Sequence, residues 1–109
     1  MRIISGKFKG RTITSLNSKF IRPMTDRVRV NLFDILTNKI DFQGVKVLDI
    51  YSGSGSLGLE CLSRGADEIH FVEKNLWFQL NIIENYTIYQ KYFFLINSKK
   101  KKIIFIRKN

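Results

Sequence analysis

The chain has 109 residues, 44% of them hydrophobic, and a formal net charge of +10 at neutral pH, which suits one small globular domain. It contains no run of about 18 apolar residues, so the sequence predicts no membrane-spanning helix. The N-terminus MRIISGKFKG lacks the apolar block of a signal peptide, and we therefore expect a cytoplasmic protein.

The charge is distributed unevenly along the chain. Residues 1–29 carry eight Lys or Arg and one acid, residues 30–90 carry four Lys or Arg and eight acids, and residues 91–109 carry seven Lys or Arg and no acid. Basic segments on both sides of a neutral-to-acidic centre indicate a polyanionic partner such as nucleic acid, bound through its phosphates. The alternative, that the basic tails only aid solubility, carries more weight for the C-terminal segment.

The first 22 residues predict a basic β-hairpin or paired arm. Apolar-basic runs at residues 2–4 and 11–13 flank the glycine-containing turn SGKFKG. In an extended strand Lys7, Lys9 and Arg11 would share one face, where they could bind a phosphate backbone. Phe8 lies among them and either contacts a base or packs into its own domain.

An amphipathic helix is expected from Asp26 to about Lys39. Thr25 is a good N-cap, and Asp26 suits the positive end of the helix dipole. For Arg27 and Arg29, in the first turn, salt bridges and RNA phosphate contacts are both open. The apolar residues recur at helical spacing, namely Val28, Leu32, Ile35, Leu36 and Ile40.

The central stretch, residues 45–65, predicts a strand, a ligand-binding loop and a helix in succession. Residues 47–50 form a short apolar run that contains Asp49, as in a buried parallel strand. Residues 53–58 match G-x-G-x-x-G, in which glycines permit positive φ and close approach of a ligand to the backbone. The following helix, which ends near Gly65, would direct free N–H groups at that ligand.

A second strand, residues 67–73, ends in Glu73. This acid follows the first glycine of the loop by about twenty residues, where a doubly wound fold places the carboxylate that binds a ribose. Nicotinamide dinucleotides and S-adenosylmethionine both contain such a ribose. Asp49 favours S-adenosylmethionine, since an acid beside the glycines would repel a pyrophosphate but suits a sulfonium cofactor with a free amino group.

The C-terminal third predicts one more helix and two strands. Leu76, Leu80, Ile83 and Thr87 recur at helical spacing, and residues 92–96 and 103–106 read as strands of an edge hairpin with a lysine-rich turn. The sequence thus divides into a basic arm at 1–22, a cofactor-binding βα core at 23–90 and a basic tail at 91–109.

Cysteine and histidine, which often serve in catalysis and metal binding, occur once each. Cys61, the single cysteine, reads as a small packed residue of the helix after the glycine loop. His70, the single histidine, is expected on the outer side of its strand without a catalytic role. These two side chains provide no credible metal site, so no metal is predicted.

Three segments resemble the RsmD-type family of bacterial 16S rRNA (guanine-N2-)methyltransferases. They are the opening MRIISGKFKGR, the segment RPMTDRVRVNLFDIL, and VLDIYSGSGSLGLECLSRGA followed by FVEKN, and together they cover roughly residues 1–75. That family transfers a methyl group from S-adenosylmethionine to a guanine amine of small-subunit rRNA. The resemblance implies an α/β, Rossmann-like S-adenosylmethionine-dependent methyltransferase fold with an N-terminal β-hairpin extension.

The resemblance also implies roles for individual residues. The glycine loop would line the methionine end of the cofactor, Glu73 would bind the ribose, and the start of the first helix would close the site. The implied cofactor-binding residues are Asp49, Ser52, Gly53, Ser54, Gly55, Glu73, Lys74, Asn75, Thr25 and Asp26. The candidate RNA-binding residues are Lys7, Lys9, Arg11, Arg22, Arg27 and Arg29.

Two departures from the family pattern limit what the resemblance implies. Val30 occupies a position where the family usually has glutamate, and the catalytic signature, Asp or Asn followed by Pro-Pro and an aromatic residue, is absent because Pro23 is the only proline. No catalytic residue is therefore assigned. We interpret the fold as truncated after two or three βα units, with a truncated or out-of-frame tail from about residue 78.

Two other functions remain open. The chain could be a non-enzymatic RNA-binding fragment, whose RNA affinity would be indifferent to S-adenosylmethionine, or the remnant of a decayed gene. A nicotinamide-dependent oxidoreductase is disfavoured by Asp49 and by the basic arm. Cofactor binding discriminates among these hypotheses.

Overall fold

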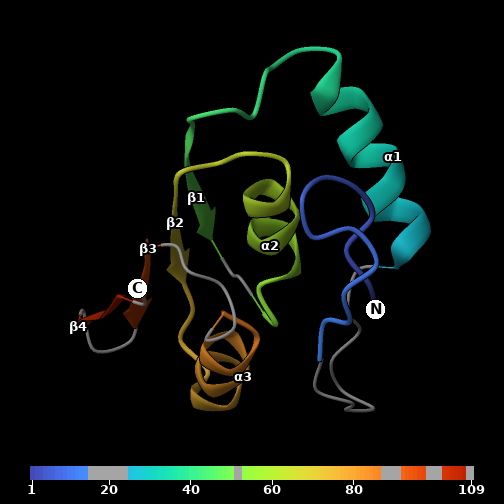
Figure 1. Ribbon diagram of the computed structural model, residues 1–109. Coiled ribbons are helices and arrows are strands. Elements are labelled where there is room, and N and C mark those ends of the chain that lie inside the picture. The colour runs from blue at the N-terminus through green and yellow to red at the C-terminus, as the bar shows by residue number, and fades with distance from the viewer. Residues whose placement is uncertain (15–24, 51–52, 87–91, 98–101, 108–109) are drawn as a thin grey trace.

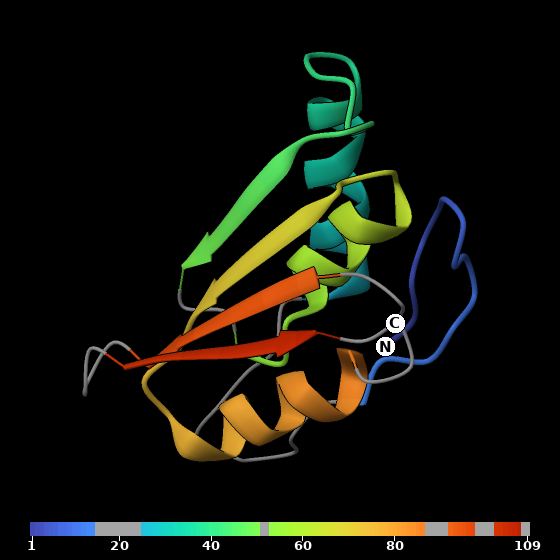
Figure 2. The ribbon, with the colours of Figure 1, turned by 60° about the vertical axis from the view of Figure 1, so that its left-hand side comes forward.

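The computed structural model describes residues 1–14, 25–50, 53–86, 92–97 and 102–107, with side chains up to residue 85. Its four strands form one sheet in the order β1-β2-β3-β4, and Figure 1 and Figure 2 show the three helices on one side of this sheet. The strands are β1 (Lys46–Ile50), β2 (Glu68–Val72), β3 (Tyr92–Asn97) and β4 (Lys102–Arg107), and the helices are α1 (Asp26–Thr37), α2 (Ser56–Ser63) and α3 (Leu76–Tyr86).

The sheet is parallel from β1 to β3. β1 pairs with β2 in the register Asp49 to Phe71, and β2 pairs with β3 in the register Phe71 to Leu95. The helices α2 and α3 are therefore the crossovers of two successive βαβ units, as the sequence pattern predicts. β4 pairs with β3 in antiparallel orientation, which confirms the expected hairpin. Since β3 also pairs with β2, this hairpin belongs to the sheet.

The predicted helices form, but two of them bury other faces than their apolar spacing suggests. In α1 the buried residues are Arg29 and Phe33, whereas Val28 and Ile35 are about half exposed. In α3 Leu76 and Leu80 are exposed, and the buried side chains include Gln79, Asn81, Ile82 and Asn85. These polar side chains are buried because they bond to backbone groups of other segments. Thr87 lies outside the described residues.

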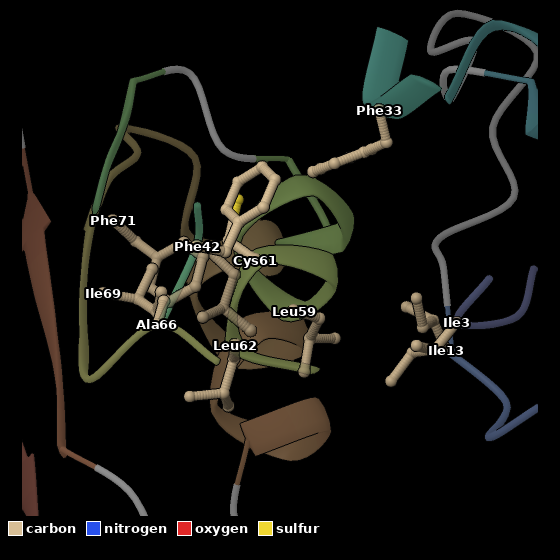
Figure 3. Close-up of a cluster of buried hydrophobic side chains, with 11 residues drawn as sticks. Ile3, Ile13, Phe33, Phe42, Leu59, Cys61, Leu62, Ala66, Ile69 and Phe71 are labelled. Carbon is tan, nitrogen blue, oxygen red and sulfur yellow. The ribbon is translucent and has the colours of Figure 1, made fainter. Parts of the chain in front are cut away.

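The core lies around α2, which packs between the sheet and the N-terminal segment. Of its eight residues, seven are buried. Figure 3 shows Ile69 and Phe71 of β2 on one side of α2, and Ile3 and Ile13 on the other. Strand β2 lies very close to α2 at Gly58. A Cβ at this position would lie 2.5 Å from Cε1 of Phe71.

The first 14 residues, which we call the arm, fold back on themselves. One antiparallel bridge joins Arg2 to Thr12, and the Ile13 N–H donates to the Met1 carbonyl at 2.8 Å. Within residues 1–14 the predicted hairpin is thus a loop closed by one isolated β-bridge, and neither side of it forms a continuous strand. Phe8 is half-buried against the core, with the Lys7 ammonium 5.6 Å and the Arg11 guanidinium 5.1 Å from its ring centroid.

The opposite face of the sheet differs from the face that carries the helices. Leu48 and Ile50 of β1 point to that side and remain 61% and 54% exposed. Figure 2 shows none of the three described helices in front of it. The described residues therefore cover one face of a sheet type that is ordinarily buried on both.

Candidate cofactor site

The glycine loop connects the carboxyl end of β1 to the first turn of α2. Gly53 has φ 57° and Gly55 has φ 83°, in the left-handed region that glycine adopts without a Cβ clash. Gly55 is the N-cap of α2 and provides no side-chain cap. Of the first N–H groups of the helix, that of Gly58 donates to Asp49 Oδ2, and Gly55 adds no side-chain acceptor that would occupy those before it.

Asp49 lies directly beneath this turn. Its side chain is buried, with the residue 8% exposed, and its Oδ2 accepts a hydrogen bond from the Gly58 N–H at 3.3 Å. Burial raises the pKa of Asp49 from 3.8 to about 7, the Gly58 hydrogen bond opposes this shift, and the charge of Glu73 adds to it. Asp49 therefore changes charge near neutral pH, which makes it sensitive to a cationic ligand.

Glu73 joins the end of β2 to the glycine loop. Its Oε1 accepts from the Gly53 N–H and its Oε2 from the Asn75 N–H, both at 2.9 Å. Glu73 is 7% exposed as a residue, and each of its carboxylate oxygens retains a second lone pair. The spacing of about twenty residues thus places Glu73 within hydrogen-bond distance of the first glycine of the loop.

The neighbours of Glu73 are held by α3. Asn75 Oδ1 accepts from the Trp77 N–H at 2.9 Å and the Phe78 N–H at 3.3 Å, so Asn75 caps this helix. Lys74 is exposed. Asn85, at the other end of α3, donates to the Ser54 carbonyl at 3.0 Å and thereby ties the buried Ser54 of the glycine loop to α3.

Sequence reasoning missed Asn85 and Gln79 as supports of the site. Gln79 donates to the Glu73 carbonyl at 3.0 Å, and Asn85 also bonds to both backbone groups of Thr14. A polar residue on a helix ordinarily indicates an exposed face, and no local pattern distinguishes these two. Gln79 satisfies a backbone group six residues earlier in the chain, and Asn85 satisfies backbone groups of segments remote in sequence.

The side chains of Thr25 and Asp26, at the start of α1, bond to groups within the same helix. Thr25 Oγ1 accepts from the Val28 N–H at 3.3 Å, which confirms Thr25 as the N-cap, and Asp26 pairs with Arg29 at 3.1 Å. Figure 1 shows α1 starting at the end of the sheet where β1 and β2 finish. In the part of the chain that the structure describes, neither residue bonds to the glycine loop. Ser52 and Arg22 lie outside that part.

The candidate RNA-binding residues separate into two groups. Lys7, Lys9, Arg11 and Arg27 are exposed, whereas Arg29 is 0% exposed. The Arg29 guanidinium donates to the Arg2 carbonyl and to Asp26 Oδ1. Its expected availability to RNA is therefore wrong in this conformation, because the arm covers it.

Cys61 and His70 lie where the sequence predicts, Cys61 buried in α2 and His70 partly exposed on its strand. Burial, with smaller effects from the Asp49 and Glu60 charges, raises the pKa of the Cys61 thiol to about 12, so it is a packed and unreactive residue. His70 is partly covered on the face of the sheet without helices and pairs with Glu68 at 3.1 Å. Among the described residues there is no group of three His, Cys, Asp or Glu that could hold a metal, and no helix long and apolar enough to cross a membrane.

The chain is similar to a protein-family model and to several known proteins. A family model described as "Conserved hypothetical protein 95" matches residues 1–106. Ribosomal RNA small subunit methyltransferase D of Haemophilus influenzae is 45% identical over 73 residues, which are 67% of this chain and 37% of that protein. The protein of the same name from Escherichia coli is 40% identical over 85 residues, 78% of this chain and 42% of that protein.

Solved structures agree with these relatives. The Escherichia coli protein yhhF, described as a methyltransferase, superposes with a TM-score of 0.75 at 34% identity over 90% of this chain and 52% of that chain. A hypothetical protein of Thermus thermophilus superposes with a TM-score of 0.68 at 36% identity over 78% of this chain and 47% of that chain. The chain therefore spans about half of these structures and about 40% of the curated relatives.

The extent of the match corrects one expectation. The motifs suggested a resemblance over roughly residues 1–75, but the family model continues to residue 106. The matched range includes α3, β3 and most of β4, and β3 pairs in register with β2. Both findings argue against an out-of-frame origin of this segment.

Proposed function

The chain belongs to the RsmD family of ribosomal RNA methyltransferases, and on this premise we propose that it binds S-adenosylmethionine and serves methylation of guanine N2 in small-subunit rRNA. One observation carries the cofactor part of the proposal. The glycine loop, Asp49 and Glu73 converge at the carboxyl end of two parallel strands, with the Gly53 N–H already bonded to Glu73. Open α/β sheets bind their ligands at such an edge.

The residues present fit this cofactor. Asp49, with its pKa near 7, would favour the cationic methionine end, and the lone pairs that remain on Glu73 would accept the ribose hydroxyls. Gly53 and Gly55 have no side chain between the ligand and the backbone, and Lys74 and Asn75 would flank the adenosine. The bound cofactor supplies an electrophilic methyl group, and the role of this chain is to hold and orient it.

The RNA part of the proposal rests on the arm. Lys7, Lys9 and Arg11 are exposed on a segment that packs against α2, the helix that starts at the glycine loop. Together with Arg27 and the sequence-based candidate Arg22, they would neutralise phosphates of the rRNA in the cytoplasm. Arg29 is left out of this set because it is buried.

The chain supplies no recognised group for holding the target amine. The family signature of Asp or Asn followed by Pro-Pro and an aromatic residue does not occur in the 109 residues. We therefore propose that a second polypeptide segment supplies that function when methyl transfer takes place. The alternative, RNA binding without a cofactor, is not favoured by any described contact.

Complementation tests this function. The chain is mixed with a polypeptide that comprises the part of the Escherichia coli enzyme beyond the matched region, together with labelled S-adenosylmethionine and unmodified 16S rRNA or small subunits. The expected product is N2-methylguanosine, identified by mass spectrometry of the nucleosides, and its formation depends on this chain. Methylation of a different atom would contradict the proposed substrate, and the intact relative serves as the positive control.

A further inference from the structure

Helix α2 carries two buried polar side chains on the side that faces away from the sheet. Glu60 is 0% exposed and Ser63 is 3% exposed. Among the described residues neither side chain hydrogen-bonds to the glycine loop, and a buried glutamate is costly unless its charge is matched. Both side chains bond to the arm, residues 1–14, instead.

Glu60 binds two consecutive backbone amides of the arm. Its Oε1 accepts from the Ile4 N–H at 2.7 Å, and its Oε2 accepts from the Ser5 N–H at 3.1 Å. The Arg64 Nε also donates to Oε2 at 3.1 Å, so the carboxylate has a cationic partner one helical turn away. Charged acceptors make stronger hydrogen bonds than neutral ones, and these two join residues more than fifty positions apart.

Ser63 extends this contact toward the basic part of the arm. Its Oγ donates to the Ser5 carbonyl at 2.6 Å and accepts from the Phe8 N–H at 3.0 Å. The Lys7 N–H donates to the Ser63 carbonyl at 2.7 Å. The backbone on both sides of Lys7 is therefore fixed to α2, and the exposed cations project from a held segment.

Gly6 makes this approach sterically possible. It has φ +88°, and a Cβ at this position would lie 2.1 Å from the Ser63 carbonyl oxygen. Gly10 provides the natural comparison, since its φ is +87° but a Cβ there would meet nothing within 4 Å. Only Gly6 combines the backbone requirement with a close contact to α2.

From these contacts we infer that Glu60 and Ser63 dock the arm onto α2 and so fix the position of bound RNA relative to the methyl donor. Glu60 lies about 8 Å along the helix axis from Gly55, given a rise of about 1.5 Å per residue. The same short helix thus begins at the cofactor loop and holds the RNA-binding cations. Glu60 is a positioning residue, and its role in RNA binding depends on the proposed function.

The docking itself can be tested without RNA or cofactor. Trypsin cleaves after Lys7, Lys9 and Arg11, all within the docked arm. Glu60→Gln replaces one carboxylate oxygen with an amide donor that faces a backbone N–H, and we expect cleavage at these sites to accelerate at least tenfold. Asp34→Asn, the same carboxylate-to-amide change at an exposed position of α1, is the matched control and should cleave like the unmodified chain.

The positioning role is tested by comparing two affinities of the same variant. For Glu60→Gln we expect affinity for a 16S rRNA fragment to fall about tenfold, and affinity for S-adenosylmethionine to change less than threefold. Accelerated cleavage with unchanged RNA affinity would overturn the positioning role. Equal losses of both affinities would also overturn it, because they would indicate a general structural defect.

A second pair of variants keeps the inference testable if Glu60→Gln fails to fold. Gly6→Ala should release the arm and reproduce the tenfold loss of RNA affinity, whereas Gly10→Ala should leave the arm docked. Equal cleavage rates for these two variants would contradict the docking contact. Failure of the unmodified chain to bind S-adenosylmethionine would instead contradict the proposed function, while the cleavage result would stand.

Discussion

Two buried carboxylates beside helix α2 have different roles: Asp49 comes from β1, and Glu60 from the helix itself. At its first turn, burial of Asp49 raises the pKa of that carboxyl to about 7. One turn further along, Glu60 accepts two backbone N–H groups and pairs with Arg64. A carboxylate whose charge is matched within the protein fixes structure, whereas one destabilised by burial can respond to a cationic ligand. We interpret Asp49, at the start of the helix, as a ligand-binding group and Glu60 as a structural one.

The largest expected effect concerns Asp49 and pH. Its pKa is raised from 3.8 to about 7, so between these values the folded chain binds a proton that the unfolded chain has lost. The free energy of unfolding should therefore fall as pH rises from about 4 to 7, by at most about 4 kcal/mol. Urea denaturation at several pH values measures this slope.

Asp49→Asn should remove most of that pH dependence, because an amide does not titrate. Asp34→Asn, at an exposed position of α1, should retain it. An unchanged slope in Asp49→Asn would mean that other groups cause it. In that case the contrast between Asp49 and Glu60 would lose its physical basis.

The next effect concerns the close packing that holds α2 in place. In Gly58→Ala the new Cβ would lie 2.5 Å from Cε1 of Phe71 and 2.9 Å from Cγ2 of Ile69, both in the core. Overpacking of this kind costs about 1–3 kcal/mol. Chemical denaturation should show that loss, and a stability equal to that of the unmodified chain would contradict the tight contact between α2 and β2.

A smaller effect is expected at Glu73, which connects the glycine loop to β2. Glu73→Gln keeps the shape but replaces one oxygen acceptor with a donor opposite the Gly53 or Asn75 N–H. A lost hydrogen bond to a charged group is worth about 1.5–3 kcal/mol, part of which rotation of the amide recovers. We expect about tenfold weaker binding of S-adenosylmethionine by calorimetry, and unchanged affinity would remove Glu73 from the site.

The smallest effect concerns single cations of the arm. Lys9→Ala removes one exposed charge, so the slope of log RNA affinity against log salt concentration should decrease by about one. Lys39→Ala, at an exposed position after α1, is the matched control and should leave the slope unchanged. Equal slopes for Lys9→Ala and the unmodified chain would argue against phosphate binding by the arm.

Much of the site could be predicted because it depends on local sequence. The apolar run with Asp49, the glycine spacing and Glu73 all lie within residues 47–73, and a βα unit brings them together by its regular geometry. The N-cap Thr25 and the crossover helices follow from similarly local patterns. The structure places these residues close to where the sequence suggests.

The parts that could not be predicted depend on contacts between distant segments. Glu60, Asn85 and Arg29 all occupy helix positions where a polar side chain ordinarily indicates solvent. Each is buried because it bonds to a backbone group of another segment, over separations of 27 to 71 residues. Hydrophobic periodicity carries no information about hydrogen-bond partners, so it could not predict that the arm covers α2.

The most direct test of the account is calorimetric titration of the purified chain with S-adenosylmethionine, with Asp49→Ala as the control. We predict saturable binding by the unmodified chain, stronger at pH 8 than at pH 6 because ionised Asp49 favours the cationic ligand. The Asp49→Ala variant should not bind. A folded chain that shows no binding at either pH, or that binds equally well without Asp49, would contradict the assignment of this site.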